Sequence, residues 1–382
     1  MPRAAHRYRT ATRKEKRWCI PPALLSHPGE TVEGLAVLEE DSTETGLLLW
    51  TSLRAVILWA AVPQDERDGL FPPGASDDLL QLIAAAPLDR ELAIALTTLA
   101  TVLDMPASVN PEIVSLVCSQ VSRWAEERGR PAAALSYTVA AAATQPENAA
   151  CARDVGRLAM AGSDSRWAET WVRRAAALAR RSVDWETYGY AYLHLAEIYL
   201  GRELPERAAR YLRTAARVGR SYAIRELRAR AQHGLARLLM QQEDMLSQAE
   251  RHARIALRAY GEGHAQRPDV LFDLTSIWVA SGRYGRAVTL LRRLRAPRDG
   301  PERRVTRLAL LARAAAGARQ NRLYQESWGW AWAELDRVTA EGRHRALLEL
   351  ARAAELAQDG LRLAQARGAG SFTDPEAGAD RR

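Results

Sequence analysis

The chain has 382 residues, 47% of them hydrophobic, enough for two or three ordinary domains or for one repeat array that grows without a single enlarging core. Alanine and leucine dominate and strand-forming residues are scarce, so the composition predicts an all-α protein. The net charge of +8 is uneven, because residues 19–130 carry six arginines against seventeen acids, a net −11 that argues against nucleic-acid binding there.

Neither export nor membrane insertion is indicated. Cys19, Cys118 and Cys151 are far apart and form no C-x-x-C motif, which is typical of free thiols in a reducing cytoplasm. The basic N-terminus is followed by Trp-Cys-Ile-Pro-Pro rather than by an apolar run. The most apolar stretch, Leu47 to Val62, contains Arg54 and is shorter than the roughly 20 residues that span a bilayer. We therefore expect a cytoplasmic protein without membrane contact, and a buried helix at 47–62.

Two different segments precede the regular part of the chain. Residues 1–18 hold seven Lys/Arg against Glu15 and show no helical stripe, so we expect a basic disordered tail. Residues 19–110 form an irregular helical N-terminal region, with apolar helices expected at Leu47–Val62, Leu79–Ala86 and Leu92–Leu103. This region is interpreted either as degenerate hairpins that cap the rest or as a separate small helical domain.

A helical hairpin is legible between residues 268 and 294. Apolar or small side chains recur with helical spacing on both sides of Gly282, which suits the left-handed conformation that ends a helix. The residues at the signature positions of the tetratricopeptide repeat are Leu274, Thr275, Trp278, Gly282, Tyr284, Ala287, Leu291 and Leu294. The stretch therefore resembles one tetratricopeptide repeat, and the resemblance implies a right-handed superhelical array of helix-turn-helix units.

Similar units recur over residues 111–340. Their starts fall near Ser115, Ala149, Gly189, Ala229, Pro268 and Val305, with spacings of 34, 40, 40, 39 and 37 residues. The first spacing equals the repeat length of the family, and the others imply longer helices or connections. About six repeat-like units are expected, followed by a capping helix at 341–368 and a disordered tail at 369–382.

Small residues recur where the two helices of each unit must approach one another. On the first helix they are Ser122, Gly156, Ala196, Ala236, Thr275 and Ala312. The facing residues on the second helix are Ala134, Ala168, Ala208, Ala249, Ala287 and, as a departure, Tyr324. Small side chains let two helix backbones pack closely. Their recurrence at equivalent positions of six units therefore predicts a repeat array, in addition to the signature residues found between 268 and 294.

Patterns that carry catalysis or bind cofactors are missing from the sequence. It contains no Gly-rich phosphate loop, G-x-S-x-G, H-E-x-x-H or EF-hand loop. His194 and His233 lack a third ligand at metal-binding spacing. We expect no enzyme activity, no cofactor and no metal.

In the resembled family, the first helix of each unit lines a concave groove. Counting along each unit, the resemblance places ten residues on this face: Arg123, Arg153, Arg157, His194, Glu197, His233, Arg237, Asp273, Ser276 and Arg313. Four of six units have arginine at the same position, and guanidinium groups suit carboxylates. The row therefore predicts an acidic partner, although arginine is abundant here and composition alone is the alternative. The lysine-and-asparagine clamp of chaperone-tail binders is missing.

The leading hypothesis is a non-enzymatic scaffold or adaptor that binds a peptide or protein segment in the groove. The alternative is a peptide-sensing regulator that contacts nucleic acid through its N-terminal region or its basic tail. The acidic charge of residues 19–130 and the lack of a helix-turn-helix signature favour the scaffold.

Overall fold

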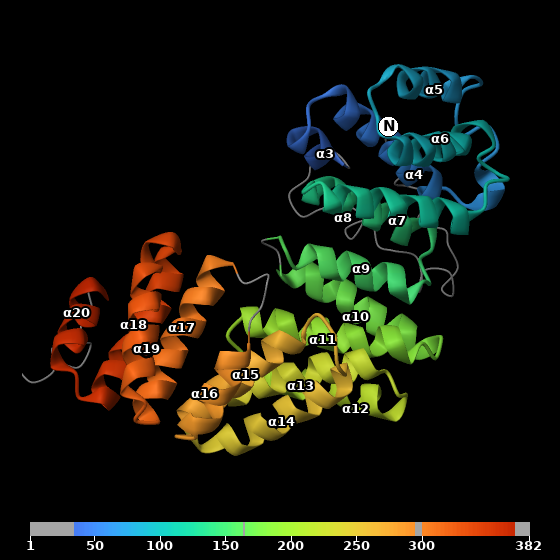
Figure 1. Ribbon diagram of the computed structural model, residues 1–382. Coiled ribbons are helices and arrows are strands. Elements are labelled where there is room, and N and C mark those ends of the chain that lie inside the picture. The colour runs from blue at the N-terminus through green and yellow to red at the C-terminus, as the bar shows by residue number, and fades with distance from the viewer. Residues whose placement is uncertain (1–33, 163–164, 295–299, 371–382) are drawn as a thin grey trace, which may run out of the picture. The chain divides into compact units, whose positions relative to one another are not determined.

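The computed structural model describes residues 34–162, 165–294 and 300–370. Within these residues the chain forms α-helices and short 3-10 turns and contains no strand, which confirms the all-α prediction (Figure 1). The expected basic tail at 1–18 and most of the C-terminal tail lie outside the described residues. The chain divides into two compact units, Met1–Val218 and Gly219–Arg382.

The first unit contains α3 (Leu35–Glu40), α4 (Glu44–Ala61), α5 (Ala75–Ala85), α6 (Arg90–Asp104), α7 (Pro111–Glu127), α8 (Pro131–Thr144), α9 (Ala149–Ala159), α10 (Ser165–Arg181), α11 (Trp185–Gly201) and all but the last three residues of α12 (Pro205–Ser221). The second contains α13 (Arg225–Leu239), α14 (Leu246–Tyr260), α15 (Arg267–Ala280), α16 (Tyr284–Arg293), α17 (Pro301–Gly317), α18 (Asn321–Ala333), α19 (Ala340–Ala357) and α20 (Gly360–Gly370). Successive helices pair as hairpins, and the first helices of the six expected units are α7, α9, α11, α13, α15 and α17.

The irregular N-terminal helices share one core with the first hairpin. Leu53 of α4 and Leu96 of α6 are fully buried in the same cluster as Tyr137 of α8. The Tyr137 hydroxyl donates a hydrogen bond to the Leu49 carbonyl at 2.7 Å. The Glu40 carboxylate accepts hydrogen bonds from two free N–H groups in the first turn of α8, where such groups lack helical partners. The apolar stretch at 47–62 is thus a buried helix, and no helix among the described residues is both long and apolar enough to cross a bilayer.

The small residues predicted at the helix contacts are all buried. The Ser122 hydroxyl of α7 donates to the Ala134 carbonyl of α8 at 2.8 Å, so the two backbones approach within the length of one side chain. At Gly156 of α9, an added Cβ would lie 2.4 Å from Cγ2 of Val172 on α10. A larger residue at that position would force the hairpin apart. The recurrence read from the sequence therefore corresponds to real close contacts.

Five of the turns inside the hairpins share one backbone motif. Gly282 has φ 73°, as the sequence predicts, and four equivalent residues are also left-handed: Gly129, Glu203, Arg319 and Gln358. In each case the next residue donates its N–H to the carbonyl five residues back, at 2.8 to 2.9 Å. This hydrogen bond defines the Schellman ending of a helix. In three of the five turns the left-handed residue is not glycine, so its side chain makes this backbone conformation sterically unfavourable.

The last of these turns makes the C-terminal segment differ from expectation. Residues 341–368 contain two helices, α19 and α20, instead of one capping helix. The helix ends because Gln358 is left-handed, with φ 56°, and Asp359 then accepts a hydrogen bond from the N–H of Arg362 in the following helix. The segment is therefore a seventh hairpin.

Replacing Arg319 by glycine is expected to stabilise the protein by roughly 0.5–1 kcal/mol, because glycine adopts the left-handed conformation without the steric cost paid by other residues. The midpoint of urea unfolding measures the change. Gly282→Ala, at an equivalent turn, should lower the midpoint by a similar amount. A lower midpoint for Arg319→Gly would contradict this account of the turns.

Candidate interaction surface

All ten residues expected to line the groove lie on the first helices of their hairpins. In the first unit, α7 carries Arg123, α9 carries Arg153 and Arg157, and α11 carries His194 and Glu197. In the second unit, α13 carries His233 and Arg237, α15 carries Asp273 and Ser276, and α17 carries Arg313.

The arginines of the first unit differ in how they are engaged. Arg123 is exposed and has no polar partner among the described residues. Arg157 makes two parallel hydrogen bonds to the Glu126 carboxylate of α7, at 2.9 and 2.8 Å. Arg153 is half-buried and bonds to its neighbour Asp154 at 2.8 and 3.0 Å. Only Arg123 of these three has its full donor set available.

A carboxylate on the preceding helix explains the geometry at Arg157. Hydrogen bonds from the Arg157 guanidinium lower the pKa of Glu126, against the opposing effect of partial burial. The same hydrogen bonds raise the pKa of Arg157. Glu126 lies on the same helix as Arg123, one turn further on, and no local sequence pattern marks it as the partner of Arg157, 31 residues away.

The remaining two residues of the first unit differ in accessibility, since Glu197 is exposed and His194 is buried. His194 is 5% exposed, and its Nδ1 lies 3.0 Å from Oε2 of Glu197 one turn later on α11. Tyr190, on the same helix, lies beneath the Arg153 guanidinium, whose Cζ is 5.9 Å from the ring centroid. Of His194 and Glu197, Glu197 is therefore the accessible one.

In the second unit the predicted residues also pair between neighbouring first helices. His233 Nε2 of α13 lies 2.7 Å from Oδ2 of Asp273 on α15. Arg313 of α17 is mostly buried and holds Glu349 of α19 at 3.0 Å. Ser276 bonds to a carbonyl of its own helix. Arg237 is exposed and has no polar partner among the described residues.

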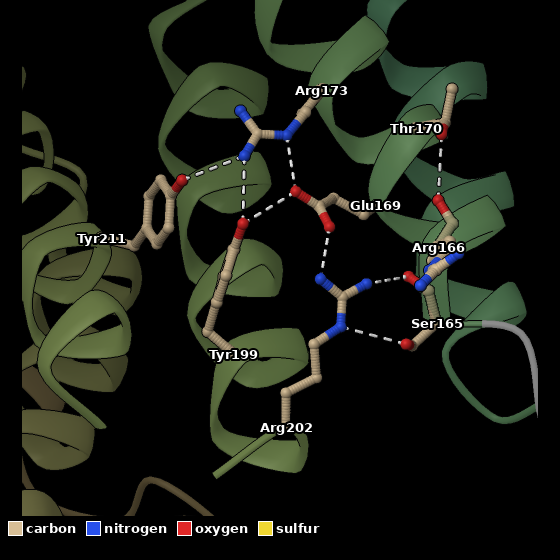
Figure 2. Close-up of polar contacts among 8 residues, drawn as sticks. All are labelled: Ser165, Arg166, Glu169, Thr170, Arg173, Tyr199, Arg202 and Tyr211. Carbon is tan, nitrogen blue, oxygen red and sulfur yellow. Dashed lines mark hydrogen bonds and ion pairs between the residues drawn. The ribbon is translucent and has the colours of Figure 1, made fainter. Parts of the chain in front are cut away.

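A second type of polar contact, not anticipated from the sequence, joins successive hairpins of the first unit (Figure 2). Glu169 of α10 accepts hydrogen bonds from Arg173 Nε at 2.7 Å and from the Tyr199 hydroxyl at 2.9 Å. Its other oxygen accepts from Arg202 Nη1 at 2.5 Å. Arg173 also donates to the hydroxyls of Tyr199 and Tyr211, each at 3.2 Å. The cluster ties α10 to the turn between α11 and α12.

Glu250 of α14 repeats this arrangement in the second unit. Its side chain is 8% exposed and accepts a hydrogen bond from Trp278 Nε1 at 2.8 Å. It also forms ion pairs with Arg254 Nη2 at 2.8 Å and with Arg283 Nη1 at 2.6 Å. Each glutamate follows the small residue of its second helix and pairs with the arginine four residues later. Each also holds an aromatic side chain and an arginine near the next tight turn, so the two are equivalent positions of the repeat.

The hydrogen bonds decide the protonation of both glutamates. Burial by itself would raise the pKa of Glu169, but hydrogen bonds from Arg173, Arg202 and Tyr199 outweigh burial and lower the pKa to about 2. The pKa of Glu250 is likewise lowered, since bonds from Trp278 and Arg283 exceed the effect of its burial. Both carboxylates are ionised structural groups rather than acids or bases poised near neutral pH.

Other reactive groups do not assemble into a chemical site within the described residues. Burial raises the pKa of the Cys118 thiol and, to a smaller extent, that of Cys151, which opposes the thiolate form needed for nucleophilic attack. No group of three metal-ligating side chains occurs in the same part of the chain. Cys19 lies outside the described residues.

Several solved structures have a similar fold. The apo form of RapI matches with a TM-score of 0.53 and 14% identity, covering 67% of this chain and 96% of its own. Aspartyl phosphate phosphatase F from Bacillus subtilis matches at 0.50 and 10%, covering 91% and 95%. A signal transduction ATPase with a tetratricopeptide repeat sensor from Pyrococcus horikoshii matches at 0.48 and 16%, covering 71% and 46%.

The chain has a tetratricopeptide-like repeat fold, which confirms the resemblance seen in the sequence. At these identities the likeness concerns the fold alone. No family model matches the sequence, and no curated protein is similar to it.

Glu169→Gln is expected to lower stability at pH 7 by about 2 kcal/mol, since the neutral amide gives up two charge-assisted hydrogen bonds. The folded-state pKa of about 2 lies below the ordinary glutamate value of 4.5, so the unfolded chain binds more protons between these values. The contribution of Glu169 is therefore complete above about pH 4.5 and lost as the pH falls towards 2.

Urea unfolding midpoints at pH 7, 4 and 2.5 measure this effect, and the gap between the wild type and Glu169→Gln should narrow as the pH falls. Glu39→Gln, at an exposed carboxylate of α3, is the control and should give little change at any of the three. A gap that stays constant down to pH 2.5 would be incompatible with a depressed pKa at Glu169.

Proposed function

We propose that this protein is a non-enzymatic interaction scaffold that binds a peptide or protein segment through the first helices of its hairpins. The fold supports a general role of this kind, because stacked hairpins present extended surfaces that suit docked segments. The finer statement, that the ligand is acidic and peptide-like, depends on the side chains of α7.

One face of α7 carries the observation on which the proposal mainly depends. Ile113 and Leu116 are 51% and 59% exposed, and Arg123 follows two turns after Leu116. With 3.6 residues per turn, these three side chains lie on the same side of the helix. Two exposed apolar residues beside an arginine without a partner form a surface for a segment that offers both an apolar side chain and a carboxylate.

The Arg157–Glu126 pair supports the acidic character of the ligand. On the neighbouring first helix, a guanidinium already holds a carboxylate through two parallel hydrogen bonds. Arg123 can offer the same fork to a carboxylate from outside the chain. Arg157 and Arg313 have partners within the protein, so an acidic ligand would have to displace a glutamate to reach them. Arg123 and Arg237 are the more accessible members of the predicted row.

The alternative regulator would use residues 1–18 or the N-terminal region to contact nucleic acid. The basic tail lies outside the described residues. The described helices before α7 belong to the acidic part of the sequence, which opposes phosphate binding.

Arg123→Glu is expected to reduce partner retention at least tenfold, because it replaces a charge-assisted contact by repulsion. Affinity capture from the native cell, quantified by mass spectrometry, compares this variant with the wild type. Leu116→Ser tests the apolar half of the same surface and should have the same effect on the same partner.

Arg90→Glu is the matched control, because Arg90 is also exposed and without a polar partner among the described residues but lies on α6. Retention of the same proteins by all four chains would overturn the proposed surface. Unfolding midpoints should remain within about 0.5 kcal/mol of the wild type, as for ordinary surface substitutions.

A further inference from the structure

The second helix α12 carries a row of arginines that are not part of the first-helix surface. Arg210, Arg213 and Arg217 are all exposed and follow one another at i, i+3 and i+7, so they lie on one side of the helix. None of them has a polar partner among the described residues. Arg207, by contrast, lies over the ring of Tyr199, with Cζ 5.7 Å from its centroid.

Comparison with α10 and α14 shows what α12 lacks. In those helices a glutamate follows the buried small residue, Glu169 after Ala168 and Glu250 after Ala249, and it pairs with the arginine four residues later. In α12 the residue after Ala208 is Ala209, and the arginine four residues later is Arg213. Arg213 therefore lacks the carboxylate that Arg173 and Arg254 have. The abundance of arginine in the chain does not explain this, because what differs between the helices is the missing glutamate.

The unpaired row works against the stability of the helix. Arg210 and Arg213 are three residues apart, and Arg213 and Arg217 are four apart, so like charges face each other on adjacent turns. An anion placed along this face would relieve the repulsion and use donors that are otherwise only hydrated. A negative charge from outside the chain would therefore stabilise α12 in its present arrangement.

We propose that this face of α12 binds an acidic helical segment of a partner protein, whose carboxylates replace the glutamate that α12 lacks. Glutamates at i, i+3 and i+7 of a helix repeat with the same 5.4 Å turn as the arginines and can meet them turn by turn. The proposal relies on the interaction role proposed above and adds to it a second surface and the chemistry of its ligand.

Two other occupants fit the surroundings less well. Insertion into a membrane needs an exposed apolar face, whereas Ala208, Leu212 and Ala215 of α12 are buried. Single-stranded nucleic acid is held by aromatic side chains that stack on its bases. The aromatic residue of α12, Tyr211, accepts a hydrogen bond from Arg173 and stacks on Tyr199 at 5.2 Å (Figure 2).

Fluorescence anisotropy with a labelled 15-residue alanine-based helix tests the proposal. One probe has glutamate at i, i+3 and i+7, and the matched probe has glutamine there. The wild type should bind the glutamate probe about tenfold more tightly, from three exposed charge pairs. The preference should disappear in Arg210→Gln/Arg213→Gln/Arg217→Gln and should weaken between 50 and 200 mM salt.

Ala209→Glu provides the sharper test, since it restores within the chain the carboxylate present in α10 and α14. The new glutamate should pair with Arg213, raise the unfolding midpoint slightly and lower the affinity for the glutamate probe at least about threefold. Ala209→Gln has nearly the same size without the charge and is expected to leave probe affinity unchanged. Equal affinities for the two Ala209 variants would overturn the proposal.

The remaining outcomes separate the two surfaces and the two kinds of ligand. Loss of the glutamate probe in Arg123→Glu, but not in the α12 triple variant, would move acidic binding to the first helices and overturn this inference while sparing the proposed function. If the triple variant loses binding of the glutamate probe while Arg123→Glu leaves partner capture unaffected, this inference stands and the proposed first-helix surface is overturned. Tight binding of a duplex DNA probe but of neither peptide would reject a carboxylate ligand for α12.

Discussion

The close approach of the two helices in each hairpin is the constraint on which the other contacts depend. Gly156 stands where a methyl group would collide with Val172, and Ser122 reaches the backbone of the facing helix directly. Because the backbones meet at small residues, bulky side chains such as Trp171 lie to the side, in a core shared by α9, α10 and α11. Tight packing within a hairpin thus leaves the large apolar groups to join one hairpin to the next.

Two carboxylates, the partly buried Glu169 and the buried Glu250, fix the position of one hairpin against the next. Each of these glutamates binds an arginine of its own helix and an arginine of the next tight turn. Each also accepts a hydrogen bond from an aromatic side chain in the last turn of the helix before that tight turn. A buried charge is costly unless it is paired and hydrogen-bonded, so an arrangement in which the turn is displaced leaves the carboxylate unsatisfied. Apolar contacts tolerate small shifts of one hairpin against the next, whereas these hydrogen bonds do not.

In an arginine-rich chain, the presence or absence of a carboxylate partner within the protein distinguishes structural arginines from those available for binding. Where a glutamate is available on the neighbouring helix, as at Arg157 and Arg313, the guanidinium is engaged within the protein. Where the expected carboxylate is missing, as beside Arg213, the cation remains available. Exposure alone therefore says less about function than the contrast between equivalent positions of the repeat.

The sequence by itself determined the hairpin repeat, because small residues at the helix contacts and the glycine at Gly282 are local requirements that leave a periodic pattern. It also determined that the arginine row falls on the first helices. Only the tertiary structure decided which arginines are free, since Glu126 and Glu349 lie 31 and 36 residues from their partners in the chain and meet them through the stacking of hairpins. Left-handed turns without glycine, as at Arg319, leave no local signal, because packing on both sides imposes that conformation on a residue that does not favour it.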